Sequence, residues 1–260
     1  MDTTEVGELT KGKDGTSVAV EIRSRHTQKP RTYNLIRQEV KISSVVYKDL
    51  DRQIAYIRIT EFAFPETTVR FYGALARASN KAGLIIDLRD NGGGALDAAS
   101  MMIGYFVGPN RLVVNTKGRD FQGEPYTAPH LTPAHDWTPV KYPPKIVVLV
   151  NNYSASASEV MAGNLQQHKD VTILGVRTFG KATVQNYLDI DKPDHVPDAN
   201  TRLLLGITIA RYYLPDGTDI SSVGVMPDIE VEQPDNFRIY EYGTRRDRQL
   251  QEALKFLRKK

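Results

Sequence analysis

Three serines, Ser154, Ser156 and Ser158, alternate with alanine in the stretch NNYSASASEV at residues 151–160. A serine hydroxyl can act as a nucleophile in acyl transfer, but only when a base removes its proton. A simpler interpretation is structural, because Ser156 and Glu159 have the spacing of a capping box at the start of a helix. The local pattern alone favours capping, and a catalytic interpretation depends on partners elsewhere in the chain.

Histidine and lysine are the side chains that could serve as the base. No Ser/His/Asp arrangement follows from the five histidines, most of which fall in loops or polar stretches: His26, His130, His135, His168 and His195. Lys181, in RTFGKATVQ, has small or apolar neighbours and no acidic residue near it. A lysine base must be neutral near pH 7, so burial would have to lower its pKa by about 3 units from about 10.4. The Ser–Lys pair is a known variant of the catalytic triad, although Lys181 taken alone is better interpreted as an exposed loop lysine.

Acyl transfer also needs donors for an oxyanion, and the sequence offers two groups of backbone amides. One is the amide of Ala157, which follows Ser156 at the expected start of a helix, where free N–H groups point outward. The other is the stretch NGGG at residues 91–94, where missing side chains let backbone amides approach a ligand. The alternative for NGGG is a plain tight turn. A dinucleotide-binding loop fits worse, because GGGALD lacks the G-x-G-x-x-G spacing.

Two strand–turn–helix units place these groups. The apolar run LIIDL at 84–88 precedes NGGG and a helix at 95–106, and KIVVLV at 145–150 precedes SASAS and a helix at 159–170. This arrangement predicts parallel strands with crossover helices, so both turns should lie at the carboxyl edge of one sheet, where α/β proteins bind ligands. Alternation and helical spacing predict further strands at 17–23, 32–40, 42–50, 54–62, 171–176 and 202–215, and helices at 3–11, 65–80 and 243–258.

Composition narrows the function classes. The 260 residues carry a net charge of +3 and no cysteine, which excludes disulfides, a thiolate nucleophile and a cysteine metal site. Basic residues are interleaved with acidic ones except in the terminal KFLRKK, so we expect no nucleic-acid partner. The longest apolar runs are strand-length, so we expect no membrane span. The opening residues begin in the middle of a pattern, and we expect any native export signal to lie outside this sequence.

Four motifs follow one another along the chain: GLIIDLRDNGGG, VVLVNNYSASASEVMAG, TFGKATVQ and ITIARYYLPDGTDISSVGVMPDIEV. In this order they resemble the carboxyl-terminal processing proteases, the S41 family of serine peptidases, over about residues 35–260. The resemblance implies an α/β fold with a crotonase/ClpP-like core of ββα units, in which parallel strands are joined by crossover helices. It implies a serine endopeptidase without a metal or cofactor, acting on protein or peptide chains bound in extended conformation near nonpolar carboxyl termini.

The resemblance also assigns roles to residues. Ser156 would be the nucleophile, Lys181, 25 residues later, the base, and Gln185 the residue that holds the lysine side chain. The oxyanion donors would be Gly93 and the Ala157 amide.

Other family positions support the site or depart from the pattern. Gly94 could replace or assist Gly93, and Glu159 and Thr178 fall on supporting positions. Gln167 stands where some members carry an acid, and Ala182 where glycine is common.

Family members usually carry a PDZ domain before the core. Residues 1–40 are similar to only its second half, and residues 41–260 would form the peptidase core. The resemblance implies a periplasmic or otherwise exported bacterial protein and leaves room for a homo-oligomer. Two alternatives stay open: a peptide-binding fragment that is inactive because its PDZ domain is incomplete, and a crotonase-like acyl-CoA enzyme, against which the Ser–Lys pair argues.

Overall fold

The computed structural model describes residues 3–23, 29–38, 43–118, 125–127, 142–190 and 203–259, and the chain divides into two compact units, Met1–Ser43 and Ser44–Lys260. The first unit contains α1 (Thr3–Thr10) and an antiparallel pair, β1 (Ser17–Arg23) and β2 (Pro30–Ile36). These elements confirm the helix and the strands predicted there. That the unit is part of a PDZ domain stays a prediction.

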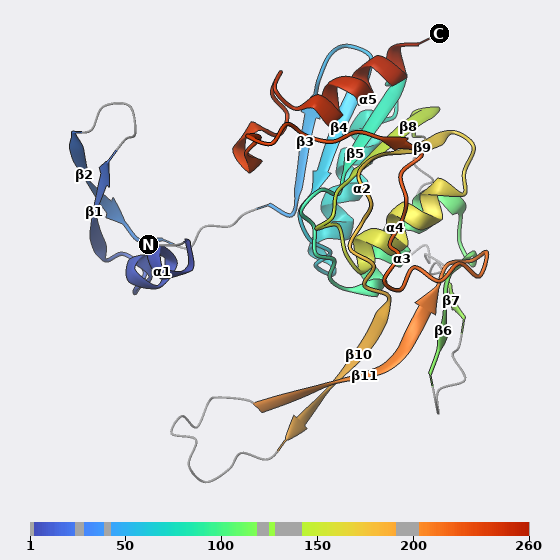
Figure 1. Ribbon diagram of the computed structural model, residues 1–260, viewed down its shortest axis with the longest axis horizontal. Coiled ribbons are helices and arrows are strands. Elements are labelled where there is room, and N and C mark those ends of the chain that lie inside the picture. Colours follow the sequence, from blue (N-terminus) through green and yellow to red (C-terminus); the bar gives the residue numbers. More distant parts are fainter. Residues whose placement is uncertain are drawn as a thin grey trace. The chain divides into compact units, whose positions relative to one another are not determined.

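The second unit is built on a six-stranded sheet with the order β12-β9-β8-β5-β4-β3 (Figure 1). Only β3 is antiparallel to its neighbour; the other adjacent pairs are parallel. In chain order the strands are β3 (Val45–Asp49), β4 (Ile54–Ile59), β5 (Gly83–Asp87), β8 (Lys145–Val150), β9 (Val171–Gly175) and β12 (Ile229–Glu230). The predicted α/β fold with parallel strands and crossover helices is therefore confirmed.

Helices cover both faces of this sheet. One face packs against α2 (Glu66–Ala78), α3 (Leu96–Val107) and α4 (Ala157–Gln166), and the other against α5 (Arg248–Arg258). Alternate residues of each central strand enter the two cores, as the period of two in a strand requires. This two-sided burial explains why the central strands are continuous apolar runs.

Helix α5 begins at Arg248, five residues later than the sequence predicts. The Asp247 side chain accepts a hydrogen bond from the Leu250 amide, at 3.1 Å, and so caps the helix. The residues before it form a 3-10 turn at Ile239–Glu241 and a loop that the Asp247 carboxylate also holds, through the Gly243 amide at 3.0 Å. Leu250 and Leu254 of this helix are buried.

A second sheet, with the order β10-β11-β6-β7, supplies the rest of the candidate site. Its strands are β10 (Thr183–Ile190), β11 (Leu203–Tyr213), β6 (Leu112–Lys117) and β7 (Tyr126–Thr127), all antiparallel to their neighbours. In Figure 1, β10 and β11 extend away from the helices as a long ribbon. The start of β10 and the end of β11 lie at the base of this ribbon.

The carboxyl ends of β5 and β8 lie side by side, because these strands are parallel neighbours in register from Gly83↔Lys145 to Asp87↔Leu149. The loop that follows β5 contains the NGGG stretch, and the loop that follows β8 contains the three serines. The topology therefore brings the two predicted turns together at one edge of the sheet.

Candidate active site

Ser156 stands at the junction between the β8 loop and α4 in a rare backbone conformation. Its φ of 57° and ψ of −118° lie outside the regions that residues with a side chain normally adopt. The side chain is partly exposed, whereas the alternating serines Ser154 and Ser158 are fully buried. The geometry thus singles out the middle serine as the one that reaches solvent.

The predicted capping box of Ser156 and Glu159 is confirmed at the start of α4. Glu159 accepts a hydrogen bond from the Ser156 amide, at 2.9 Å. A capping residue normally has extended backbone angles that direct its side chain at the helix amides. Ser156 has a positive φ instead, and its Oγ lies 3.1 Å from the Tyr212 hydroxyl oxygen.

Ser154 and Ser158 attach the turn to the neighbouring loop. The Ser154 hydroxyl donates to the carbonyl of Leu88 at 2.8 Å, and the Ser158 hydroxyl donates to the carbonyl of Asn91 at 2.8 Å. The Ala155 amide also donates to the Asn91 carbonyl, at 3.0 Å. These bonds hold the serine turn against the loop that contains the three glycines.

Glu159 is the buried centre of the hydrogen bonding. Its Oε2 accepts from the amides of Ser156 and Lys181, at 2.9 and 2.8 Å. Its Oε1 accepts from the Thr178 hydroxyl and the Gly180 amide, both at 2.6 Å. One fully buried carboxylate therefore joins the backbone of Ser156 to the backbone of Lys181. The Thr178 hydroxyl in turn accepts from the Val225 amide, at 2.6 Å.

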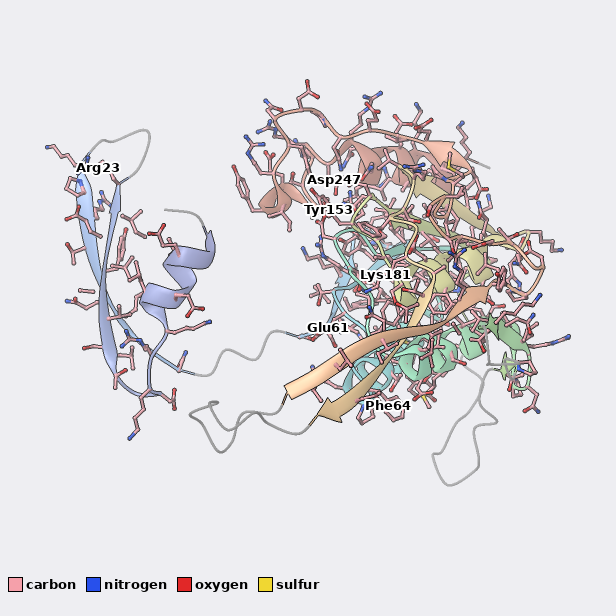
Figure 2. The ribbon with its side chains drawn as sticks, turned by 60° about the horizontal axis from the view of Figure 1, so that its bottom comes forward. Arg23, Glu61, Phe64, Tyr153, Lys181 and Asp247 are labelled. Atoms are coloured by element: carbon pink, nitrogen blue, oxygen red, sulfur yellow. The ribbon has the colours of Figure 1, made fainter. Side chains whose placement is uncertain are left out.

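A pocket of about 360 Å³ brings most of the predicted residues together. Ser156, Ala157, Gly94, Lys181 and Gln185 line it, with further walls from Gly92, Leu96, Thr183, Val184 and Tyr212. Lys181, labelled in Figure 2, lies on the loop between β9 and β10, and its side chain is exposed. Between the described side chains of Ser156 and Lys181 the structure records no hydrogen bond.

The predicted oxyanion donors differ in availability. The Ala157 amide is the first of α4, belongs to a residue that lines the pocket, and has no acceptor among the described residues. The Gly93 amide donates to Asn91 Oδ1 at 2.9 Å, so it is already engaged. Gly93 nevertheless packs tightly on the serine turn, since a Cβ there would lie 2.8 Å from the Ser156 Cβ. Gly94 lines the pocket itself.

Tyr212 is a site residue that the sequence patterns did not reveal. It stands near the end of β11, 56 residues after Ser156, and is 5% exposed. Burial raises the pKa of the Tyr212 phenol; the hydrogen bond with Ser156 opposes this effect, and the charge of Glu159 adds to it. The phenol is therefore protonated at neutral pH and can donate a hydrogen bond. No local pattern marks it, because its position depends on how β11 pairs.

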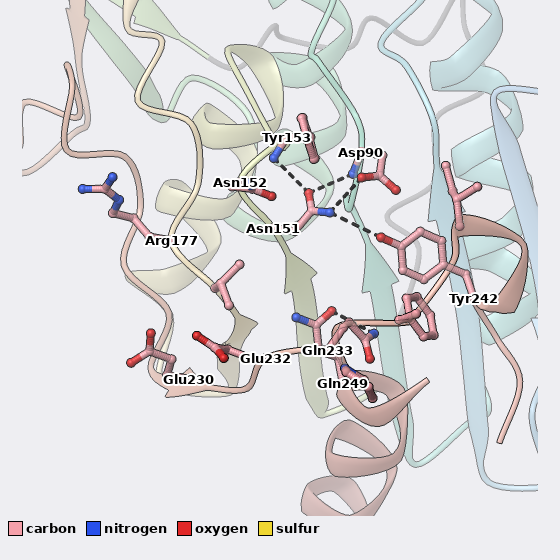
Figure 3. A pocket seen from close by; sticks show the side chains of 14 residues that line it. Asp90, Asn151, Asn152, Tyr153, Arg177, Glu230, Glu232, Gln233, Tyr242 and Gln249 are labelled. Carbon is pink, nitrogen blue, oxygen red and sulfur yellow. Dashed lines mark hydrogen bonds between the residues drawn. The ribbon is translucent and has the colours of Figure 1, made fainter. Parts of the chain in front are cut away.

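A second pocket, of about 570 Å³, lies behind the same two loops and is shown in Figure 3. In its wall the side-chain Nδ2 of Asn151 donates to Asp90 Oδ1 at 2.8 Å and to the Tyr242 hydroxyl at 3.3 Å. The Asp90 amide donates back to Asn151 Oδ1 at 3.0 Å. The pair thus ties the first residues of the serine turn to the start of the glycine loop.

A buried arginine anchors this region and was also missed. Arg89 makes ion pairs with Asp87 at 2.6 Å and with Asp247 at 2.8 Å, and its guanidinium lies 4.0 Å from the centre of the Tyr242 ring. Burial lowers the pKa of Arg89, but the two carboxylates outweigh it and raise the pKa above its usual value. The segment before α5 is thereby fixed to the carboxyl end of β5.

Other chemistries find little support in the described part of the chain. His168 is the one histidine within it, near the end of α4; His26, His130, His135 and His195 lie outside the described residues. No group of three or more His, Asp or Glu side chains suited to a metal ion occurs among the residues that the structure describes. In the same residues, no helix is long and apolar enough to cross a membrane.

Comparison with known proteins points to one family. The model for peptidase family S41 matches residues 53–231. The chain is 33% identical over 230 residues to a carboxy-terminal-processing protease of Bartonella bacilliformis and 32% identical over 231 residues to a carboxyl-terminal-processing protease of Synechocystis. Each match covers 86% of this chain and 49% of the relative, so the chain spans about half the length of these curated relatives.

Solved structures share the fold of this chain. A photosystem II D1 C-terminal processing protease is similar with a TM-score of 0.56 and 29% identity, over 90% of this chain and 61% of that one. An S41 protease from Bacteroides fragilis shares the fold with a TM-score of 0.64 at 15% identity, over 93% of this chain and 65% of that one.

Proposed function

The chain belongs to peptidase family S41, and on that premise we propose that it is a serine endopeptidase of the carboxyl-terminal processing type, with Ser156 as nucleophile and Lys181 as base. The observation that carries the proposal is the Glu159 carboxylate, which accepts hydrogen bonds from the amides of both residues. A backbone link of this kind fixes the two loops relative to each other, as a two-residue catalytic unit requires.

In the proposed reaction the Ser156 Oγ attacks the scissile carbonyl carbon. Lys181 Nζ takes the Oγ proton and passes it to the leaving amine as the peptide C–N bond breaks. Water then hydrolyses the acyl-enzyme, and the Oγ regains a proton. Gln185, which lines the same pocket, would hold the lysine side chain in place.

The developing oxyanion would be bound by backbone amides. The Ala157 amide supports this role because it is the first amide of α4, at the positive end of the helix dipole, and no described residue accepts from it. Gly93 is the second proposed donor, and using it requires the bond from its amide to Asn91 to lengthen. Gly94, which lines the pocket, is the alternative.

The proposed substrates are protein or peptide chains in extended conformation, cleaved near nonpolar carboxyl termini. Among the described strands β10 forms an edge of its sheet, and it supplies Thr183, Val184 and Gln185 to the pocket. An extended chain could add to such an edge through main-chain hydrogen bonds. We also propose that residues 1–40 are the second half of a PDZ domain and that the protein is exported.

The test uses the full chain and an unfolded protein substrate. Ser156→Ala and Lys181→Ala should each lower the cleavage rate by about a thousandfold or more, because members of a catalytic unit are each needed. Lys169→Ala, which removes an exposed lysine from the turn after α4, is the matched control. A fluorophosphonate label on Ser156 reports the reactive hydroxyl separately. Full activity in a folded Ser156→Ala or Lys181→Ala variant would disprove the dyad.

One observation favours a second candidate function, a peptide-binding protein that does not cleave. The Ser156 hydroxyl is hydrogen-bonded with Tyr212, and not with Lys181. If a reporter peptide binds tightly, survives intact and leaves Ser156 unlabelled by the fluorophosphonate, this alternative replaces the peptidase. Acyl-CoA chemistry would be excluded by labelling of Ser156.

A further inference from the structure

The Tyr212 side chain meets the Ser156 hydroxyl inside the pocket. The two hydroxyl oxygens are 3.1 Å apart, which is within hydrogen-bond distance. The Tyr212 ring is almost wholly buried and lines the same pocket as Lys181 and Ala157. The phenol is thus a fixed polar group that directly touches the atom proposed to attack the substrate.

The backbone fixes where this phenol lies. The Tyr212 amide donates to the carbonyl of Ala182 at 3.1 Å, so the residue is bonded to the loop that carries Lys181. On its other side, Tyr212 pairs with Thr116 of β6 in the four-stranded sheet. A backbone hydrogen bond on one side and strand pairing on the other leave little freedom for the phenol to move away from Ser156.

The direction of the hydrogen bond decides what Tyr212 can do. A serine hydroxyl has one hydrogen to donate and two lone pairs that accept. If the phenol donates to the Ser156 Oγ, the serine hydrogen stays available for a base. Burial and the nearby Glu159 charge favour the protonated phenol, which can act as this donor.

We propose that Tyr212 is a catalytic residue, whose hydroxyl donates a hydrogen bond to the Ser156 Oγ and turns the serine hydrogen toward Lys181. This inference rests on the proposed peptidase function. The same bond stabilises the negative charge that grows on Oγ as Lys181 takes its proton and the new C–O bond forms. It acts again when Oγ leaves the carbonyl carbon during hydrolysis of the acyl-enzyme, and Tyr212 keeps its own proton throughout.

The proposal is distinguished from a packing role by removing one atom. Tyr212→Phe keeps the buried ring and deletes only the hydroxyl, so a packing role predicts unchanged chemistry. The neighbouring Tyr213 is the matched control, because Tyr213→Phe deletes a hydroxyl one residue away on the same strand. The Tyr213 ring faces Lys117, whose ammonium lies 5.1 Å from the ring centre, and it is absent from the pocket wall.

The experiment measures kcat and KM on an unfolded protein substrate and the rate of fluorophosphonate labelling of Ser156. For Tyr212→Phe we expect kcat and the labelling rate to fall by about a hundredfold, as when one donor to a developing anion is removed, with KM unchanged. For Tyr213→Phe, kcat and the labelling rate should stay within about twofold of the parent values. The proposal is overturned if a folded Tyr212→Phe protein is labelled at the parental rate or faster. An unchanged rate would mean that the hydroxyl does not assist Ser156, and a faster rate would mean that it holds Ser156 in an unreactive state.

A second measurement tests the proposal if Tyr212→Phe fails to fold. Replacing Tyr212 by 3-fluorotyrosine keeps the shape and makes the phenol more acidic, so the dependence of the labelling rate on pH should change. An unchanged pH profile would overturn the proposal. These outcomes are separate from the test of the function itself, since a Ser156→Ala protein that still cleaves would refute the peptidase, whatever Tyr212 does.

Discussion

Replacing Glu159 by glutamine should damage both the stability of the second unit and the reactivity of Ser156. The Glu159 carboxylate is fully buried and accepts four hydrogen bonds, two on each oxygen. Glutamine has the same size but keeps only one accepting oxygen and puts an NH₂ group where the other was. At least two of the four donors then lose their acceptor.

The magnitude follows from the charge of the acceptor. A hydrogen bond to a charged group contributes about 1.5–3 kcal/mol, so losing two lowers the free energy of unfolding by about 3–6 kcal/mol. The free energy of unfolding of a typical domain is about 5–15 kcal/mol in total, so the variant would be marginally stable. Whichever way the amide turns, either the pair Ser156 and Lys181 or the pair Thr178 and Gly180 is released.

The assay is urea unfolding followed by circular dichroism, together with fluorophosphonate labelling at a temperature where the variant is folded. The matched control is Glu252→Gln on α5, where an exposed carboxylate lies 3.5 Å from Lys255. Surface ion pairs of this kind contribute little to stability. The free energy of unfolding of the control should therefore stay within about 0.5 kcal/mol of the parent value. A Glu159→Gln variant that loses less than about 1 kcal/mol and labels normally would refute the role assigned to this carboxylate.

Two further substitutions test the surroundings of the site. Gly94→Ala should destabilise the protein by more than about 2 kcal/mol, because φ is +141° and the new Cβ would lie 2.5 Å from the Phe62 carbonyl oxygen. The control is Gly73→Ala on α2, where nothing lies within 4 Å of the new Cβ. This change should stabilise the protein by about 0.5–1 kcal/mol. Asp247→Asn should lower the free energy of unfolding by about 3–5 kcal/mol at pH 7, because it removes one of the carboxylates that pair with buried Arg89, and by less at pH 3. Urea unfolding measures both.

The pH dependence of the Asp247 effect has a definite sign. Burial raises the pKa of Asp247, but the hydrogen bonds and charge of Arg89, helped by Gly243 and Gln233, outweigh it and lower the pKa below its usual value. A carboxylate with a lowered folded pKa contributes stability above its unfolded pKa of about 3.9 and loses it as the pH falls through the folded pKa. Exposed Asp235→Asn is the control, and an Asp247→Asn effect that is the same at pH 7 and pH 3 would contradict the assignment.

Much of the site could be predicted because its parts are local. Buried parallel strands are continuous apolar runs, so β5 and β8 and the turns after them are visible in the sequence, and their pairing follows from the crossover rule. The capping box at Ser156 was visible as a four-residue pattern, but the positive φ of Ser156 was not, because such a pattern gives residue types and not φ. The start of α5 was placed too early because the Asp247 cap belongs to a network that no helical periodicity reports.

Contacts between distant residues could not be predicted. Tyr212 reaches Ser156 only because β11 pairs with β6 and bonds to Ala182, and Arg89 meets Asp247 across 158 positions. Neither pair has a spacing that helices or strands would reveal. A buried arginine directly after an apolar run is a signal that a partner carboxylate exists, but it does not say where that partner lies in the chain.

The strained turn at Ser156 and the loop of Lys181 are stabilised by the same group, which makes their geometries interdependent. A non-glycine residue with positive φ costs about 1–3 kcal/mol and persists only where its surroundings hold it. Here the Ser156 amide is held by Glu159, and the same oxygen holds the Lys181 amide. Relaxation of the turn would therefore release the lysine loop, and movement of the lysine loop would weaken the support for the turn. Every hydrogen bond named in this arrangement joins residues of the unit Ser44–Lys260.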